Sequence, residues 1–256
     1  MHPLPYPRLP ERLGKLSAVV LWSNRRIPRP ELPRLRLRVA PSELAKVDFT
    51  ELVPEPVPFL GQAAYIQLEF FESLARSVAT APTLSAKEGL SRAAGGALRQ
   101  HHALIAELRR LDVEPVEVMA PFAPAAERFR QASAGADWYE LLLGIHVTAG
   151  MLDDYFSRLA AGLPGELATR VRAILAEDEA SAGVLHDELF AAIAAEPGLS
   201  DRLALWGRSL VGDTLLIARS ALRASDARDR GADVEPVFTE LIAAHTRRMD
   251  ALGLTA

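Results

Sequence analysis

The side chains best suited to chemistry in this sequence are a few polar residues on otherwise apolar helical faces. Gln67, His101 and Asp178 each occupy such a face near the middle of a predicted helix, and Glu177 stands beside Asp178. Groups of this kind at one level of a helical bundle can bind a metal ion, and a non-haem iron triad takes two histidines and a carboxylate. Only one histidine, His101, faces this level. The alternative is a hydrogen-bonded polar layer inside the core.

Helical bundles that bind a pair of iron ions follow a stricter pattern, in which a glutamate is followed three residues later by a histidine. Residues spaced in this way share one helix face, so the carboxylate can bridge the ions while the imidazole binds one of them. The sequence contains no Glu-x-x-His. It therefore lacks the clearest sequence sign of a di-iron centre.

The composition excludes several other classes of site. There is no cysteine in the 256 residues, which rules out disulfides, zinc ribbons and thiol catalysis. There is also no glycine-rich phosphate loop, serine nucleophile motif or dinucleotide fingerprint. No apolar run approaches the roughly 20 residues of a membrane helix, and the run at 16–22 lacks a signal-peptide cleavage region. We therefore predict a cytoplasmic protein without a membrane segment.

The first 58 residues differ from the rest, since they hold 11 of the 18 prolines, too many for a long helix. Residues 1–40 carry nine Lys/Arg against two Asp/Glu, although the whole chain has a net charge of −4. Short extended segments are predicted at Leu16–Trp22 and Leu35–Val39. We predict an arm that lies on the bundle or on a partner subunit, which would allow a homodimer. An RNA-binding arm is less favoured, because few aromatic residues accompany the arginines, and a disordered tail is the third alternative.

From Phe59 on, apolar residues recur at helical spacing. The best-defined helix runs from Asp137 to Leu163, where Asp137 and Glu140 resemble a capping box. Its midpoint is Ala149, which cannot bind a metal. The second helix is expected to open with a capping box at Ser85. The remaining predicted helices cover about 59–80, 85–111, 166–195, 200–225 and 234–252, with a short helical piece near 125–131.

Two helical hairpins joined by a long crossover at about 113–135 are the connectivity of a ferritin-like bundle. The expected fold is therefore all-α, a ferritin-like four-helix bundle with two additional C-terminal helices and a Pro-rich N-terminal arm. The predicted domains are 1–58, the basic arm, and 59–256, the helical domain.

Two motifs resemble a known family. Asp137-Trp-Tyr-Glu-Leu-Leu-Leu-Gly-Ile-His-Val-Thr-Ala-Gly-Met-Leu-Asp-Asp-Tyr-Phe156 and Leu203-Ala-Leu-Trp-Gly-Arg-Ser-Leu-Val-Gly-Asp213 are similar to helices of an actinobacterial ferritin-like family. That family is grouped with MiaE-like tRNA hydroxylases, di-iron enzymes that hydroxylate the isopentenyl group of a modified adenosine. The resemblance covers roughly residues 60–225. It implies a ferritin-like fold, and it implies the reaction only if the metal ligands are present.

Aligned with that family, most ligand positions hold residues that cannot bind iron. The first-helix glutamate position falls on Gln67 and the third-helix acid on Ala149. The second-helix ligand pair falls on Ala97 and Gln100. The fourth-helix pair falls on Glu177 and Ala180. The resemblance thus implies one surviving carboxylate, Glu177. If the alignment of the second helix is shifted by one residue, His101 comes to the histidine position, but no glutamate precedes it.

The remaining polar side chains have structural interpretations. Asp154 is expected to pair with Arg208, and His186 to form a surface pair with Glu179. His146 lies one turn before Ala149 and could lean toward it, but it is expected to pack at the edge of the third helix's apolar face. Glu69 and Glu72 are expected to be solvated, and His102 and His245 to lie at the boundary of the core.

Three functional hypotheses follow. The first is a ferritin-like bundle that has lost its di-iron centre and acts by binding, as a scaffold or subunit, without a metal or cofactor. The second is an iron-dependent hydroxylase acting on modified tRNA or a small molecule, with Gln67, His101, Glu177 and Asp178 in an altered site. The third is an apolar ligand cavity left by the small residues Ala97, Ala149 and Ala180.

Overall fold

The computed structural model describes residues 55–176, 179–224 and 235–255. Within these ranges the regular structure is entirely helical. Residues 1–54 of the predicted arm at 1–58, including its two extended segments, lie outside the described residues, and residues 56–58 belong to the first helix. None of the described helices is long and apolar enough to cross a membrane.

The centre of the helical domain is a bundle of two hairpins. The first hairpin is α1 (Pro56–Thr80) and α2 (Leu84–Arg110), and the second joins α5 (Trp138–Leu159) to the pair α6 (Gly165–Leu175) and α7 (Glu179–Ala195). Helix α1 packs against α2 and α5, and α7 packs against α2 and α5, which closes the bundle. This is the arrangement that the sequence predicts.

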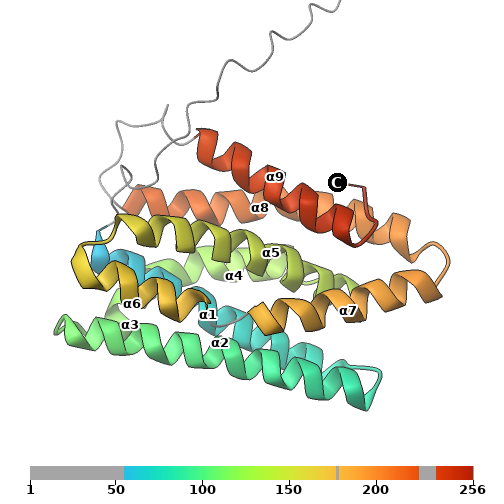
Figure 1. Cartoon of the computed structure of the whole chain (residues 1–256), viewed down its shortest axis with the longest axis horizontal. Coiled ribbons are helices and arrows are strands. Elements are labelled where there is room, and N and C mark those ends of the chain that lie inside the picture. The colour runs from blue at the N-terminus through green and yellow to red at the C-terminus, as the bar shows by residue number, and fades with distance from the viewer. Residues whose placement is uncertain (1–54, 177–178, 225–234, 256) are drawn as a thin grey trace, which may run out of the picture. The chain divides into compact units, whose positions relative to one another are not determined.

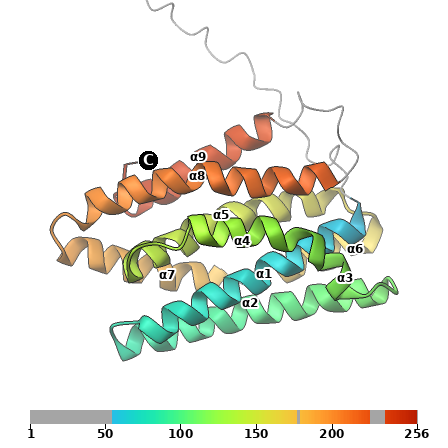
Figure 2. The same cartoon turned by 180° about the vertical axis from the view of Figure 1, so that it is seen from behind.

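The other helices lie around this bundle. The crossover between the hairpins holds α3 (Pro115–Met119), a short 3-10 turn and α4 (Ala123–Ala132). The last two helices, α8 (Leu199–Ala224) and α9 (Glu235–Ala251), pack on α5, on the side away from α2 (Figures 1 and 2). They therefore lie outside the bundle, as expected.

Helix α5 is buried on more sides than a single apolar stripe indicates. Leu142, Leu152 and Phe156 of the predicted stripe are at most 1% exposed, but Leu143 and Tyr155, outside it, are also fully buried. The reason is the second layer, because α8 and α9 cover the face of α5 that a plain four-helix bundle would leave in water.

The start of α5 is capped as the sequence predicts. The Asp137 side chain accepts a hydrogen bond from the Glu140 backbone N–H at 2.9 Å. Glu140 accepts one from the Ala136 N–H at 2.7 Å. Arg202 of α8 donates to both carboxylates, at 2.9 Å for Glu140, so the cap also ties α8 to α5.

Replacing Asp137 with alanine should lower the free energy of unfolding by about 1 kcal/mol, because the cap oxygen and one partner of Arg202 are lost together. Asn at this position is the matched control, since it keeps the cap oxygen but not the charge. Urea denaturation of both variants measures the difference. Equal stability of the alanine and wild-type chains would contradict the capping role.

Two helix boundaries differ from the prediction. The cap of α2 is Thr83, whose hydroxyl accepts from the Ala86 N–H at 3.0 Å, so the predicted capping box at Ser85 is wrong. The predicted single helix at 166–195 is divided, since α6 ends at Leu175 and α7 begins at Glu179. The Gln100 amide of α2 donates to the Leu175 carbonyl at 3.3 Å and so satisfies an acceptor at the helix end.

Candidate functional site

One candidate site is a partly open cavity of about 340 Å³ between the bundle helices. This volume is at the lower end of the roughly 300–1,000 Å³ of small-molecule sites. Its walls come from every bundle helix and from one side chain of α9. The lining residues are Gln67, Phe70 and Leu74 of α1, Ala97 of α2, Ile145, His146, Ala149, Gly150, Asp153, Asp154 and Ser157 of α5, Leu175 and Ala176, Leu185 of α7 and Arg248 of α9.

The cavity coincides with positions where the resemblance places metal ligands. Ala97 and Ala149, assigned to the second-helix and third-helix ligands, both line it, and so does Gln67. The side chain of Ala180, the third small residue of the cavity hypothesis, lies outside the described residues. The wall is not wholly apolar, because Gln67 donates to Asp153 Oδ1 at 3.4 Å.

Of the other predicted site residues, the structure describes His101, which does not join Gln67 in one polar layer. His101 is buried, but its Nδ1 lies 2.8 Å from the carbonyl oxygen of Ala64 in α1 and it is not part of the cavity wall. Glu177 and Asp178 lie outside the described residues. The polar groups Gln67, Gln100 and His101 thus each have a partner of their own.

The described donors of the cavity do not fit an iron centre of the ferritin-like type. Across residues 55–176, 179–224 and 235–255, no group of three His, Asp or Glu side chains is placed to hold a metal ion. The two carboxylates in the wall are already engaged, Asp153 by Gln67 and Asp154 by Arg248. No catalytic step through a metal follows from this geometry.

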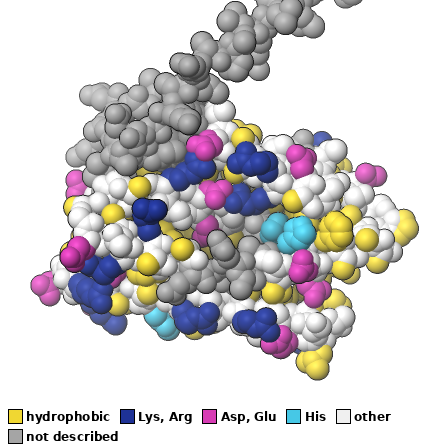
Figure 3. Space-filling model, viewed as in Figure 1, with side chains coloured by type: hydrophobic (Ala, Val, Ile, Leu, Met, Phe, Trp, Pro, Cys, Tyr) yellow, Lys and Arg dark blue, Asp and Glu magenta, His cyan; other side chains and the backbone are white. Residues whose placement is uncertain are grey.

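Asp154 and Arg248 form the charged end of the cavity. Arg248 Nη2 donates to Asp154 Oδ2 at 2.8 Å, with side-chain exposures of 24% and 32%. The predicted pair of Asp154 with Arg208 is wrong, because Arg208 is exposed on α8 and α9 supplies the partner instead. Basic and acidic side chains mix on the face shown in Figure 3, with histidine side chains close by.

Gly150 makes room for the arginine. A Cβ atom at this position would lie 2.7 Å from Arg248 Cζ, so the arginine side chain would have to move away from α5. The missing side chain therefore lets the Arg248 guanidinium lie against α5 and reach both Asp154 and the cavity. The glycine has a packing role here, which explains its place in the interior of a long helix.

Replacing Gly150 with alanine should uncouple Asp154 from Arg248. In the wild-type chain, a double-mutant cycle of Asp154→Asn and Arg248→Met should give a coupling free energy of about 1 kcal/mol, and with alanine at 150 it should fall to near zero. Gly183→Ala is the control, because open space surrounds Gly183 on α7. Unchanged coupling in the Gly150→Ala background would contradict this packing role.

His146 lies in the cavity wall as a neutral ring. Burial, the Arg248 charge and His186 lower its pKa from 6.5 to about 4. Its Nε2 is buried and has no hydrogen-bond partner among the described residues. His146 therefore contributes to the cavity wall, beyond the expected packing at the edge of the apolar face.

Of the remaining histidines that the structure describes, His245 differs from the prediction. His186 stacks on Phe190 with its Nδ1 3.2 Å from Asp187 Oδ1, so its neighbouring acid is Asp187, and the side chain of Glu179 is outside the described set. His102 is exposed, as expected at a boundary. His245 is wrongly predicted at the boundary, since it is a residue of α9 and only 2% exposed.

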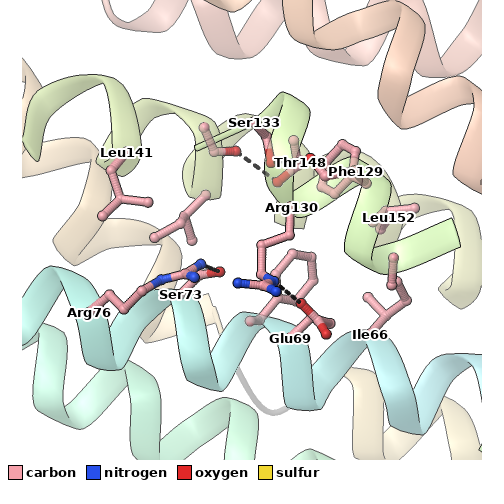
Figure 4. A pocket seen from close by; sticks show the side chains of 14 residues that line it. Ile66, Glu69, Ser73, Arg76, Phe129, Arg130, Ser133, Leu141, Thr148 and Leu152 are labelled. Carbon is pink, nitrogen blue, oxygen red and sulfur yellow. Dashed lines mark hydrogen bonds and ion pairs between the residues drawn. The ribbon is translucent and has the colours of Figure 1, made fainter. Parts of the chain in front are cut away.

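A second cavity between α1, α4 and α5 is too small for a ligand. Its volume is about 30 Å³, enough for a water molecule (Figure 4). It contains Glu69, whose prediction as a solvated residue is wrong, because its side chain is 17% exposed and lies 3.9 Å from Arg130. Burial, opposed in part by the Tyr65 hydrogen bond, raises the pKa of Glu69. Glu72 is exposed, as predicted.

The residues that sequence reasoning missed are Asp153, Gly150 and Arg248. Arg248 is remote in sequence from every motif, and only the packing of α9 on α5 brings it to the cavity. Gly150 is the one available signal, because a glycine inside a helix indicates a close approach by another group.

The comparisons with known proteins bear on most of the helical domain. No curated protein matches the chain. Residues 53–233 match a family model described as the ferritin-like domain of actinomycetes. This range contains the two hairpins, the crossover and α8, which are the elements that the family resemblance predicts. The chain therefore belongs to the ferritin-like domain family of actinomycetes.

Proposed function

We propose that this protein is a non-catalytic member of its family that binds a small molecule in the central cavity. The observation that carries the proposal is the coincidence of the cavity of about 340 Å³ with Ala97, Ala149 and Gln67, three of the positions assigned to metal ligands. Small side chains where ligands and ions would stand leave a volume that the core does not fill, although protein cores normally contain few voids of this size.

The side chains of the cavity wall indicate which parts of the ligand are apolar and which are polar. Phe70, Leu74 and Leu185 supply apolar surface from α1 and α7, while the charged and polar groups gather on α5 and α9. Such a division between apolar walls and a few polar groups is typical of small-molecule sites. A ligand with an apolar body and one polar end fits both parts.

The hydroxylase alternative receives less support. A MiaE-like iron enzyme acting on modified tRNA or a small molecule would need Gln67, His101, Glu177 and Asp178 around one metal. In the described part of the chain, His101 interacts with the Ala64 carbonyl and is not in the wall that contains Gln67. A metal-free binding protein requires none of these residues to move. A cytoplasmic location and a homodimer through residues 1–58 remain predictions from the sequence.

Titration with an uncharged fluorophore tests the proposal. Phenylnaphthylamine should bind with one molecule per chain and with increased emission, because the cavity removes it from water. Replacing Ala97, which is 2% exposed in the cavity wall, with leucine should weaken binding at least about tenfold by occupying the space. Ala106→Leu, on the exposed face of α2, is the matched control.

Absence of binding to the wild-type chain, or equal binding by the Ala97→Leu and Ala106→Leu variants, would overturn the proposal. Circular dichroism of each variant verifies that the helices are intact.

A further inference from the structure

The central cavity and the small cavity of Figure 4 lie on adjoining faces of α1 and α5, which pack against each other. On α1, the small cavity is lined by residues three or four positions apart, which share one helix face: Ile66, Glu69, Ser73 and Arg76. The central cavity is lined by Gln67 and Leu74, on the neighbouring face of the same helix. Helix α5 is divided in the same way, since Thr148 lines the small cavity and Ala149 the central one. The contact between α1 and α5 therefore separates the two cavities.

Two side chains form the partition between these cavities. Among the residues that the structure describes, only Phe70 of α1 and Ile145 of α5 line both cavities. They are 7% and 4% exposed and belong to the hydrophobic core. A side chain that borders a cavity on each side fills the space between them. Shortening either side chain should therefore join the two volumes, because the surrounding core relaxes only partially.

The central cavity is elongated along α5. Its wall on this helix runs from Ile145 to Ser157, a distance of about 18 Å at the rise of an α-helix. Toward the Ser157 end, the side chains of Asp154 and Arg248 are 32% and 24% exposed, whereas Ile145 and Phe70 at the other end are buried. A volume of about 340 Å³ over this length fits an extended chain better than a bulky ring system. The polar end of such a chain lies toward the exposed side, and its tail lies against the partition.

We propose that the ligand is an extended apolar chain with one polar end, and that Phe70 and Ile145 set its greatest length by closing the inner end of the cavity. The space beyond the partition accepts a longer tail once it is opened, because Ile66, Phe129 and Leu152 supply apolar surface there. This inference rests on the proposed function, because it names the shape of the ligand of the same cavity and the residues that limit it.

A series of straight-chain primary alcohols, from hexanol to tetradecanol, tests the inference by displacement of phenylnaphthylamine. While each further carbon finds apolar space, binding to the wild-type chain should tighten about fourfold per methylene. Binding should stop tightening at the alcohol that fills the cavity as far as the partition. The length of this alcohol, the length limit, is the quantity to be compared between variants.

Variants at the partition identify the residues that set the limit. Phe70→Ala should raise the length limit by about three carbons, because the space of the ring and the small cavity of about 30 Å³ become available. Alcohols beyond the wild-type limit should bind this variant at least about tenfold more tightly than the wild-type chain. Ile145→Ala opens the same partition from α5, should also raise the limit, and decides the question if Phe70→Ala does not fold. Phe129→Ala is the control, because this ring of α4 lines only the small cavity, and it should leave the limit unchanged.

The outcomes separate this inference from the proposed function. An unchanged length limit in a folded partition variant, an equal rise in Phe129→Ala, or wild-type binding that does not depend on chain length would overturn the inference while the cavity still binds the fluorophore. If neither the fluorophore nor any of the alcohols binds the wild-type chain, the proposed function itself is overturned.

Discussion

Replacing Ala149 with leucine should raise the free energy of unfolding by about 1 kcal/mol and weaken fluorophore binding at least about tenfold. The added carbons fill part of the cavity of about 340 Å³ and bury apolar surface, which stabilises the fold. The same carbons occupy the space of the ligand. Opposite signs for stability and binding are expected where a cavity is kept for function.

Urea denaturation and fluorophore titration of the same Ala149→Leu preparation measure both effects. Ala161→Leu, at an exposed position just after α5, is the control and should change neither. If leucine at 149 lowers stability and leaves binding intact, the cavity is not where the fluorophore binds.

The stability of the chain should fall in acid because of His146. Burial, Arg248 and His186 lower the pKa of this ring from 6.5 to about 4, whereas the ring of the unfolded chain takes up a proton near its usual value. Below about pH 6.5 the unfolded state therefore binds more protons, and the free energy of unfolding falls as the pH decreases toward 4. The loss should reach about 3 kcal/mol at the lower end and vanish above about pH 7.

His146→Phe keeps the ring volume and removes the titration, so its stability should change less over this pH range. The comparison is needed because burial and Arg248 also lower the pKa of His245. His102→Gln, on an exposed ring, is the control variant. Parallel pH profiles for the wild-type and His146→Phe chains would exclude the role assigned to His146.

The parts of the fold that could be predicted from sequence are those set by local chemistry. The start of α5 follows from Asp137 and Glu140, whose side chains satisfy backbone N–H groups within one turn. The apolar spacing likewise places α1, α2, α8 and α9, and the long crossover indicates the ferritin-like connectivity.

The parts that could not be predicted depend on contacts between distant segments. The division between α6 and α7 has no glycine or proline near Leu175, and its carbonyl is satisfied by Gln100 from another helix. The partner of Asp154 is Arg248 and not Arg208, because the position of α9 on α5 decides which arginine reaches the carboxylate. Spacing along one helix contains no information on either contact.

The sequence predicted the small residues of the candidate site better than its charged groups. The small residues Ala97 and Ala149 indicate space, and the cavity lies there. Its charged end depends on Gly150 and Arg248, which no motif connects. The polar layer of Gln67, His101 and Asp178 fails for a physical reason in its described members, since each buried polar group takes the nearest available partner on a neighbouring helix.

The most direct test of the central claim, that a ligand cavity has replaced a metal centre, is the metal content of the full chain. The protein is purified from cells grown with added iron and manganese, and its iron, manganese and zinc are measured by mass spectrometry. The account predicts far less than one equivalent of each metal and unchanged fluorophore binding after treatment with a chelator. One or two equivalents of a transition metal that are lost in the Asp178→Ala or Gln67→Ala variant would contradict it.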